Sequence, residues 1–431
     1  MKSIVVPILI FLFFCTNNFA QNYVWKTLAE PSEAGRYDDI CFVTSEIGWT
    51  VNSSGYIYKT TNGGNTWISQ FFSAAYLRSV KFADSLNGWA GTLDSTRILY
   101  QTTNGGTDWE LVTNIPSPKP KRICGLSVVN RNVIYGSGAY DGPAIVIKST
   151  DGGKTWKSID MSKYATNLID CYFYSPDSGY VVGGTPNSVF PDSIGAVILF
   201  TGNGGQGWST RYSGALKGEW GWKIDFPSPK IGYVSVENFS SASIIKTTDG
   251  GVNWFPLKLA GMEDLEGVGF INDSTGWVCG RTDESFTTDG GFTWQPVDIG
   301  DQINRFRFFG DSIGYAAGEY IYKYTKSNVV GIYANKIAPK IFFLSQNYPK
   351  PFNPSTTIEY TLPKAERVVI RIYDALGRKL ETLVDEYESA GKHSVVWDSE
   401  HQEKGILSTG FYIYRIDAGD KAESKMMLLL K

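Results

Sequence analysis

A nine-residue pattern that recurs six times constrains the fold of this chain more than any other feature. Each copy contains a polar or aromatic residue, two small residues, Asp or Asn, Gly-Gly, two further residues and Trp. Successive copies lie about 40 to 52 residues apart, a period that is typical of a solenoid or a propeller. The copies end at Trp67, Trp109, Trp156, Trp208, Trp254 and Trp294.

The chemistry of one copy predicts a tight turn. The Asp or Asn side chain can accept hydrogen bonds from amides just downstream, and glycine adopts the positive φ that such turns require. The Trp that follows can cover the turn and the edge of a small core. Each copy is therefore expected to be a β-hairpin that forms the two outer strands of a repeated unit. The turn residues are Asn62, Asn104, Asp151, Asn203, Asp249 and Asp289.

A second pattern, Gly followed by Trp or Tyr, marks the inner half of each unit. It occurs six times, and a degenerate unit at residues 126–135 supplies a seventh inner half. Seven inner halves and six hairpins leave one unit without its outer strand, and residues 23–28, which contain Trp25, have the character of that missing strand. The sequence predicts an all-β fold. A seven-bladed β-propeller would span residues 21–325, and the N-terminal strand would complete the last blade and remove the exposed sheet edges.

The two ends of the chain differ from the repeats. Residues 1–20 have a positive start at Lys2, an apolar run and a small residue, Ala20, at a plausible cleavage point, which predicts a secretory signal peptide. The apolar run is too short for a membrane anchor, so we expect no transmembrane segment after cleavage. Residues 326–340 are a polar linker, and residues 341–431 show alternating strands with short turns, which predicts a small Ig-like β-sandwich.

The residue inventory excludes several kinds of chemistry. The net charge of −3 gives no reason to expect nucleic-acid binding. The two histidines, His393 and His401, lie outside the propeller, which excludes Ser-His-Asp catalysis and histidine-bound metals there. The turns at Asn62, Asn104 and Asn203 lack the carboxylate that a calcium site would want. We expect no metal and no cofactor. Four cysteines without metal spacing are expected to be small core residues, although export would permit disulfides: Cys41, Cys124, Cys171 and Cys279.

Two resemblances follow from these motifs. The segment from Ser149 to Trp156 matches the Asp-box of neuraminidase-type repeats, and the repeats as a set resemble the propeller of photosystem II assembly and stability factors. In those families the motif is a structural turn. The C-terminal region resembles the type A sorting domain of the type IX secretion system, found in the Bacteroidetes. The residues that carry this resemblance are Asn347-Tyr348-Pro349, Pro351-Phe352-Asn353-Pro354, Ile372-Tyr373-Asp374, Gly377 and Ser408-Thr409-Gly410-Phe411-Tyr412.

The second resemblance implies a route and a partner. The type IX machinery would recognise residues 341–431 and carry the protein through the outer membrane, to the cell surface or the medium. In the family, the sorting domain is often cleaved afterwards, and the cargo is released or attached to surface lipopolysaccharide. The sequence does not distinguish these fates.

The candidate ligand-binding residues lie in the long loops that join successive blades or the second and third strands of a blade. These loops share one face of a propeller, opposite the Asp-box turns, and rigidly supported loops often carry function. Trp220 and Trp222 could stack on sugar rings, or they could pack between blades. Charged residues of the inner strands could ring the channel, and a solvated or self-paired lining is favoured over an active site: Asp38, Asp39, Arg78, Asp170, Glu266 and Arg305. The candidate ligand residues are Arg122, Tyr140, Phe190, Glu219, Trp220 and Trp222.

Three functions remain open at this point. A binding or interaction module for a glycan or protein is the leading hypothesis, because no linear pattern identifies catalytic residues. A propeller-type glycoside hydrolase, sialidase-like or xyloglucanase-like, would need only a pair of carboxylates. An assembly or scaffolding factor for another exported protein is the third. The likeness of the repeats to photosystem factors does not carry their function.

Overall fold

The computed structural model describes residues 23–29, 31, 35–186, 193–215, 218–238, 242–259, 262, 264–281, 283–310, 312–326, 342–347, 349–388, 391–399 and 407–430. The expected signal peptide and nearly all of the expected linker lie outside these residues. Within them the chain forms strands and turns and no helix, which confirms the all-β fold.

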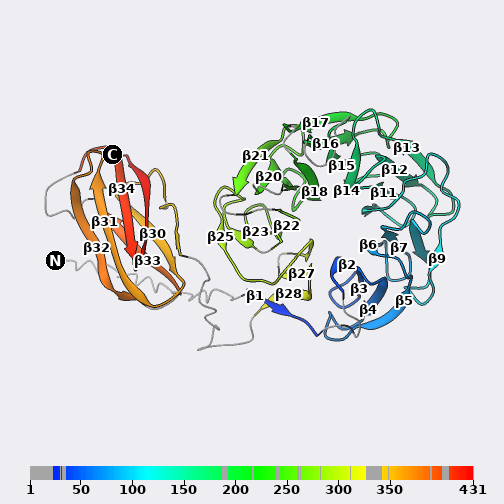
Figure 1. Ribbon diagram of the computed structural model, residues 1–431, viewed down its shortest axis with the longest axis horizontal. Helices are drawn as coiled ribbons and strands as arrows, with labels where there is room; N and C mark the ends of the chain where they lie inside the picture. The colour runs from blue at the N-terminus through cyan, green and yellow to red at the C-terminus, as the bar shows by residue number, and fades with distance from the viewer. Residues whose placement is uncertain are drawn as a thin grey trace, which may run out of the picture.

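Strands β1–β28 form seven four-stranded antiparallel sheets arranged in a ring (Figure 1). The centre of the ring, called the channel below, holds buried side chains of the inner strands such as Asp39, Asp170 and Arg305. Six sheets consist of four consecutive strands, counted from the channel outwards, and the seventh has the order β26-β27-β28-β1. The strands are β1 (Tyr23–Thr27), β2 (Tyr37–Phe42), β3 (Gly48–Asn52), β4 (Tyr56–Thr60), β5 (Ile68–Phe72), β6 (Leu77–Phe82), β7 (Gly88–Thr92), β8 (Leu99–Thr102), β9 (Glu110–Leu111), β10 (Gly125–Val128), β11 (Ile134–Gly138), β12 (Ile145–Ser149), β13 (Lys157–Asp160), β14 (Asn167–Phe173), β15 (Gly179–Gly184), β16 (Ala196–Thr201), β17 (Ser209–Ser213), β18 (Trp220–Asp225), β19 (Gly232–Glu237), β20 (Ala242–Thr247), β21 (Phe255–Leu259), β22 (Gly267–Phe270), β23 (Gly276–Cys279), β24 (Glu284–Thr287), β25 (Gln295–Pro296), β26 (Arg305–Phe309), β27 (Ile313–Ala317) and β28 (Ile321–Lys326).

The N-terminal strand closes the ring, as the count of repeats predicted. β1 pairs antiparallel with β28 from Tyr23 opposite Lys326 to Thr27 opposite Tyr322. The indole of Trp25 lies 5.5 Å from the ring of Trp277 and 5.6 Å from that of Phe306. Closure therefore combines backbone pairing with aromatic packing.

The Asp-box turns have the predicted hydrogen bonds. In the sixth blade, the amide of Thr293 donates to Asp289 Oδ1 at 2.9 Å, and the amide of Gly291 donates to Thr287 Oγ1 at 3.0 Å. Gly290 and Gly291 have φ of 76° and 89°, which side chains other than glycine rarely adopt. The indole of Trp294 then donates to the carbonyl of Gly291 at 3.0 Å and covers the turn.

A lysine at the first position of the repeated pattern and the tyrosine of a Gly-Tyr pair form hydrogen bonds between neighbouring blades. Lys246 Nζ and Tyr233 Oη donate to the carbonyl of Gly290 in the next blade, at 2.6 and 3.1 Å. Lys323 and Tyr315 of the last blade donate to Gly63 of the first blade at 2.7 and 3.2 Å. The same contacts that join adjacent blades therefore also close the ring.

The Gly-aromatic pairs make room for stacked rings. A Cβ added to Gly276 would lie 2.3 Å from the ring of Phe270, so only glycine fits beside this phenylalanine. The freed face of Phe270 stacks on Tyr233 of the preceding blade with ring centroids 3.5 Å apart. Stacking of this kind adds to the area that the rings bury.

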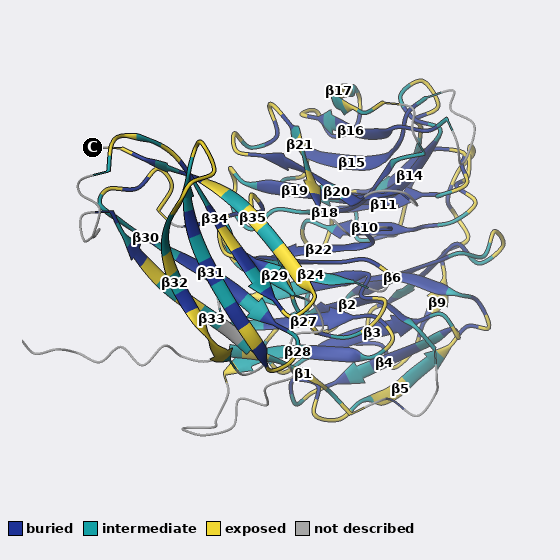
Figure 2. Cartoon of the chain, turned by 60° about the vertical axis from the view of Figure 1, so that its left-hand side comes forward, coloured by how far each residue is buried: buried dark blue, intermediate teal, exposed yellow. Residues whose placement is uncertain are grey.

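Two further sheets form the C-terminal sandwich. Their orders are β29-β30-β33 and β32-β31-β34-β35. Alternate residues along these strands point into a core that includes Trp397 and Tyr414, and the outward residues are exposed (Figure 2). The strands are β29 (Phe343–Leu344), β30 (Ser355–Leu362), β31 (Glu366–Asp374), β32 (Lys379–Glu388), β33 (Gly391–Asp398), β34 (Gly410–Ala418) and β35 (Lys421–Leu429).

Candidate functional site

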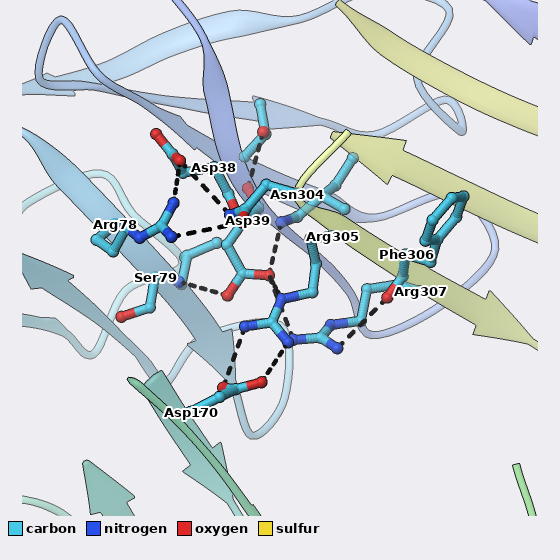
Figure 3. A network of polar contacts seen from close by, with 12 residues as sticks. Asp38, Asp39, Arg78, Ser79, Asp170, Asn304, Arg305, Phe306 and Arg307 are labelled. Atoms are coloured by element: carbon cyan, nitrogen blue, oxygen red, sulfur yellow. Dashed lines mark hydrogen bonds and ion pairs between the residues drawn. The ribbon is translucent and has the colours of Figure 1, made fainter. Parts of the chain in front are cut away.

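Charged residues of the inner strands meet inside the ring and form a buried network (Figure 3). Arg305 on β26 donates to both oxygens of Asp170 on β14, at 2.7 and 3.1 Å. Arg305 Nε also lies 3.2 Å from Asp39 on β2, and Arg307 Nη2 lies 3.3 Å from the same carboxylate. These ion pairs tie the first, fourth and seventh blades together across the channel.

A second set of pairs lies beside the first. Arg78 on β6 pairs with Asp38, and Arg36 lies 2.8 Å from Asp38 and 3.0 Å from Glu266. Asn304 donates to the carbonyl of Asp38 at 2.9 Å. Five of the six residues named from the sequence therefore pair with one another, whereas Glu266 pairs with Arg36, which the sequence reasoning did not name.

The network changes the pKa values of its carboxyl groups. Burial by itself would raise the pKa of Asp170, but the guanidinium of Arg305 and the ammonium of Lys223 lower it well below its usual range. Burial also opposes ionisation of Asp39, and Arg305 and Arg307 lower its pKa overall. Both carboxylates are therefore charged near neutral pH. Their contribution to stability is present above the unfolded pKa of about 3.9 and is lost as the pH falls through the folded pKa.

Replacing Asp170 by Ala is expected to lower the free energy of unfolding by about 3 to 5 kcal/mol, because Arg305 would remain buried without its main partner. Asp385→Ala is the matched control, since its pair with Arg367 is exposed and such pairs contribute less than about 1 kcal/mol. Urea titration at pH 7 measures both changes. Equal losses in the two variants would contradict a structural role for the channel network.

The structure brings four of the candidate ligand residues together. Tyr140 packs against a buried cluster that contains Trp220 and Trp222, and the Arg122 guanidinium lies over the Tyr140 ring at 5.0 Å. Arg78 lies over the Trp222 ring at 5.2 Å and so joins this cluster to the channel network. The four residues therefore form one wall at the end of the channel where the inner strands begin.

The indoles of this wall are covered by protein. Trp220 is 2% exposed and Trp222 is 8% exposed, and the Trp222 indole donates to Asn304 at 2.9 Å. Their burial agrees with the alternative that they pack between blades. Burial, and then the charge of Glu219, raise the pKa of Tyr212 on the outer strand β17. Phe190 lies outside the described residues. The ligand role of the six residues stays a prediction.

Two acidic residues were missed by the sequence reasoning. They lie where β19 ends and just before β22 begins, a place called the channel mouth below. Glu237 ends β19 and Asp264 precedes β22; they are 5% and 6% exposed. Glu237 Oε2 and Asp264 Oδ1 are buried, and neither accepts a hydrogen bond within the described part of the chain. Burial, and then the charges of Glu266 and Asp264, raise the pKa of Glu237 to about 9. Asp264 has a φ of 53°, in the left-handed region that few residues other than glycine, asparagine and aspartate adopt.

Lys223 is a third residue that no motif indicated. It is buried inside the ring, and its Nζ has no hydrogen-bond partner among the described residues. Burial, with the positive charges of Arg78 and Arg305, lowers its pKa well below the usual value. Within the described ranges, no three His, Cys, Asp or Glu side chains are placed to hold a metal ion. The four cysteines are buried and unbonded, in agreement with the expected core role.

The fold and the inner network define the class of protein as a seven-bladed propeller with a C-terminal Ig-like sandwich. Family comparisons then identify its parts. Residues 17–141 match the family model of the photosynthesis system II assembly factor YCF48, and residues 346–429 match the secretion system C-terminal sorting domain. The chain thus combines a YCF48-like propeller of BNR repeats with a type IX secretion sorting domain. Among the curated proteins, none matches this chain.

The sorting domain establishes where the protein acts. It implies engagement with the type IX secretion machinery and indicates export across the outer membrane, to the cell surface or the extracellular space. No helix among the described residues is long and apolar enough to cross a membrane.

Solved structures support the fold. YCF48 bound to a D1 peptide is 18% identical with a TM-score of 0.54, and the match covers 71% of this chain and 97% of that chain. YCF48 from Cyanidioschyzon merolae is also 18% identical, with a TM-score of 0.55 and coverage of 71% and 99%. PorZ, a surface component of the type IX secretion system of Porphyromonas gingivalis, is 12% identical with a TM-score of 0.51; the match covers 93% of this chain and 60% of that chain. At these identities the likeness shows the fold alone.

Proposed function

We propose that this chain is an exported binding module whose propeller captures a peptide segment at the channel mouth. The observation that carries the proposal is the pair of buried carboxylate oxygens, Glu237 Oε2 and Asp264 Oδ1, that lack hydrogen-bond partners within the described residues. The other oxygen of Asp264 lies 3.2 Å from Arg281 Nε. A buried acceptor without a donor costs about 1 to 3 kcal/mol, and a ligand that supplies the donor would remove that penalty. An ammonium or guanidinium group of a peptide side chain can donate to both oxygens, and its positive charge would lower the raised pKa of Glu237 so that this carboxyl group ionises on binding.

The surrounding residues support a rigid site. The carboxylates of Asp38, Asp39 and Asp170 are already paired with arginines, so they can hold the mouth in shape without taking part in binding. Side chains that are locked before binding lose little entropy when a ligand arrives. YCF48, which is similar in fold, has been solved with a D1 peptide bound, and this favours a peptide as the class of ligand.

A second function has a specific observation in its favour. Glu237, with a pKa of about 9, is protonated near neutral pH, and it lies close enough to Asp264 and Glu266 for their charges to raise that pKa. A protonated acid beside an ionised carboxylate is the pairing that glycoside hydrolases use. An ancestral GH74 enzyme shares the fold, at 15% identity, a TM-score of 0.52 and coverage of 92% of this chain and 60% of that chain.

The third hypothesis is assembly of another exported protein. Its partner would be a folded protein, whereas the first hypothesis has a peptide segment as the ligand. PorZ is a surface component of a secretion system, and it has a similar fold. A folded partner would need to cover more than the channel mouth, since stable protein interfaces bury about 1,200 to 2,000 Å². The described residues give no argument for a surface of that size, so the peptide hypothesis is preferred.

A pair of synthetic peptides tests the proposal. A pentalysine peptide is expected to bind the full chain, and the same peptide with every side chain acetylated is expected to bind at least 10-fold more weakly, because acetylation removes the charge. Glu237→Gln combined with Asp264→Asn should cause a similar loss, whereas Asp385→Asn on the sandwich should not. Isothermal titration calorimetry measures each affinity. Equal binding of the two peptides would overturn the proposal, and release of reducing sugar from xyloglucan that Glu237→Gln abolishes would favour the hydrolase.

A further inference from the structure

The hairpin of the fourth blade differs from the other Asp-box hairpins and contains a pocket. Strands β16 and β17 meet there, at the outer rim of the ring (Figure 1). The pocket has a volume of about 410 Å³ and is open to solvent. Its lining is formed by Phe200, Gly202, Asn203, Gly207, Trp208, Ser209 and Arg211. It lies apart from the channel mouth, because the Asp-box turns are on the opposite face of a propeller from the loops that join successive blades.

Two missing side chains open this pocket. In the first hairpin the Asn62 amide donates to the hydroxyl of Thr66 at 2.8 Å, but the equivalent of Thr66 in the fourth hairpin is Gly207. A Cβ at Gly207 would lie 3.3 Å from Asn203 Nδ2, so a side chain there would occupy the pocket. Gly202 stands where other copies have Thr, and a Cβ at this position would lie 3.4 Å from the Phe200 ring.

The pocket also holds a positive charge without an ion-pair partner. Arg211 lies at a register shift between β16 and β17, and its guanidinium lies over the Phe200 ring at 4.8 Å. Register shifts of this kind redirect a side chain. Arg211 Nε and Trp208 Nε1 are buried, and neither has a hydrogen-bond partner within the described residues. No acidic residue among them forms an ion pair with Arg211.

We propose that this pocket binds a hexuronate unit of an acidic glycan. The Arg211 guanidinium can pair with the sugar carboxylate through two parallel hydrogen bonds. The free amide hydrogens of Asn203 can donate to ring hydroxyls, and the apolar face of the pyranose can contact the aromatic side chains. The site is shallow and mostly apolar with a few polar groups, so it would contact one face of the sugar and leave the other face in solvent.

Other classes of ligand would interact with fewer of the side chains that line the pocket. A neutral sugar would use the aromatic rings and the donors but would leave Arg211 without an anion. A glutamate side chain of a peptide would pair with Arg211 but has no hydroxyls for Asn203 and no pyranose face for the aromatic side chains. The hexuronate is the class of ligand that matches the charge, the donors and the apolar lining together.

Binding of trigalacturonate to the full chain, followed by calorimetry, tests the proposal. Arg211→Gln is expected to weaken binding at least 10-fold. Gly207→Thr, which restores the residue of the first copy, is expected to weaken binding by a similar factor while the melting temperature stays the same or rises. Arg131→Gln removes an equal charge from an exposed position and should leave binding unchanged. Glu237→Gln should also leave it unchanged, which separates this site from the channel mouth.

Three results would overturn the proposal. The first is equal affinity for trigalacturonate and for a neutral galactose trisaccharide, since the charge would then play no part. The second is unchanged binding in Gly207→Thr, because the ligand would then lie elsewhere. The third is displacement of trigalacturonate by an equimolar glutamate peptide, which would assign the pocket to an acidic peptide.

Discussion

A chain that begins at Gly35, and therefore lacks β1, is expected to lose most of its thermal stability and to aggregate. The deletion removes the outer strand of the seventh blade and leaves β28 as an unpaired edge from Ile321 to Lys326. It also uncovers the Trp277 and Phe306 rings, against which Trp25 packs. An exposed apolar strand edge is a template for pairing with another chain, so aggregation accompanies the loss of stability.

A graded series makes this prediction specific to ring closure. Trp25→Ala keeps the strand but removes its aromatic contacts, and we expect it to lower the free energy of unfolding by about 2 to 3 kcal/mol, somewhat less than for a fully buried Trp. Val24→Ala is the control, because this neighbouring side chain is exposed and should change stability by less than about 0.5 kcal/mol. Circular dichroism melts measure the three melting temperatures, which are expected to be lowest for the deletion, intermediate for Trp25→Ala and highest for Val24→Ala. Full stability of the chain that begins at Gly35 would contradict closure by β1.

Much of the fold could be predicted because its determinants are local and repeated. The turn at Asp289 needs an acceptor, two glycines with positive φ and a covering Trp294, and all of these lie within six residues of one another. The seven blades follow from counting such units, and β1 follows from one unit that lacks its outer strand. Because the unit recurs, each copy supports the assignment of the others as hairpins, and a single copy would give no such support.

The candidate site depends on contacts that local patterns do not encode. Asp39 and Arg305 are 266 residues apart in the sequence, and only closure of the ring brings their side chains to 3.2 Å. Glu237 ends an apolar strand as a single acidic residue, and its neighbour Asp264 belongs to the next blade, so neither was distinguishable from a solvated loop residue. Sequence reasoning named Trp220 as a ligand residue because its loop is long, but loop length does not reveal that the indole turns inward.

The pocket of the fourth blade could be predicted from the sequence only in part. The departure of Gly202 from the repeated Thr is visible in the sequence, and so is Gly207, but their consequence is not. Only the placement of Arg211 beside Phe200 shows that the two missing side chains leave a cavity with a charge in it. Departures from an internal repeat are therefore a useful signal for sites, provided that the neighbouring strands are known.

Removal of residues 344–431 is expected to abolish delivery to the cell surface and to leave the propeller folded. Among the described residues, the hydrophobic core of the sandwich is built from Phe342 to Leu429, whereas the cores of the blades are built from residues up to Tyr324. Deleting one core therefore leaves the packing of the other intact. The sorting-domain match lies almost entirely within the deleted segment, from residue 346 to residue 429.

Cell fractionation in a bacterium that carries the type IX machinery measures this outcome, with the whole chain as reference. The truncated protein should be found in the periplasm, since the signal peptide predicted from residues 1–20 would still direct it through the inner membrane. Resistance of the trapped propeller to limited proteolysis is needed as well, because a misfolded protein could also fail to leave the cell. Tyr414→Ala provides an intermediate test: it removes a fully buried ring from the sandwich core, which should cost about 3 to 5 kcal/mol, and surface delivery should fall if the machinery reads the folded sandwich. A truncated chain that reached the surface as efficiently as the whole chain would show that recognition lies elsewhere.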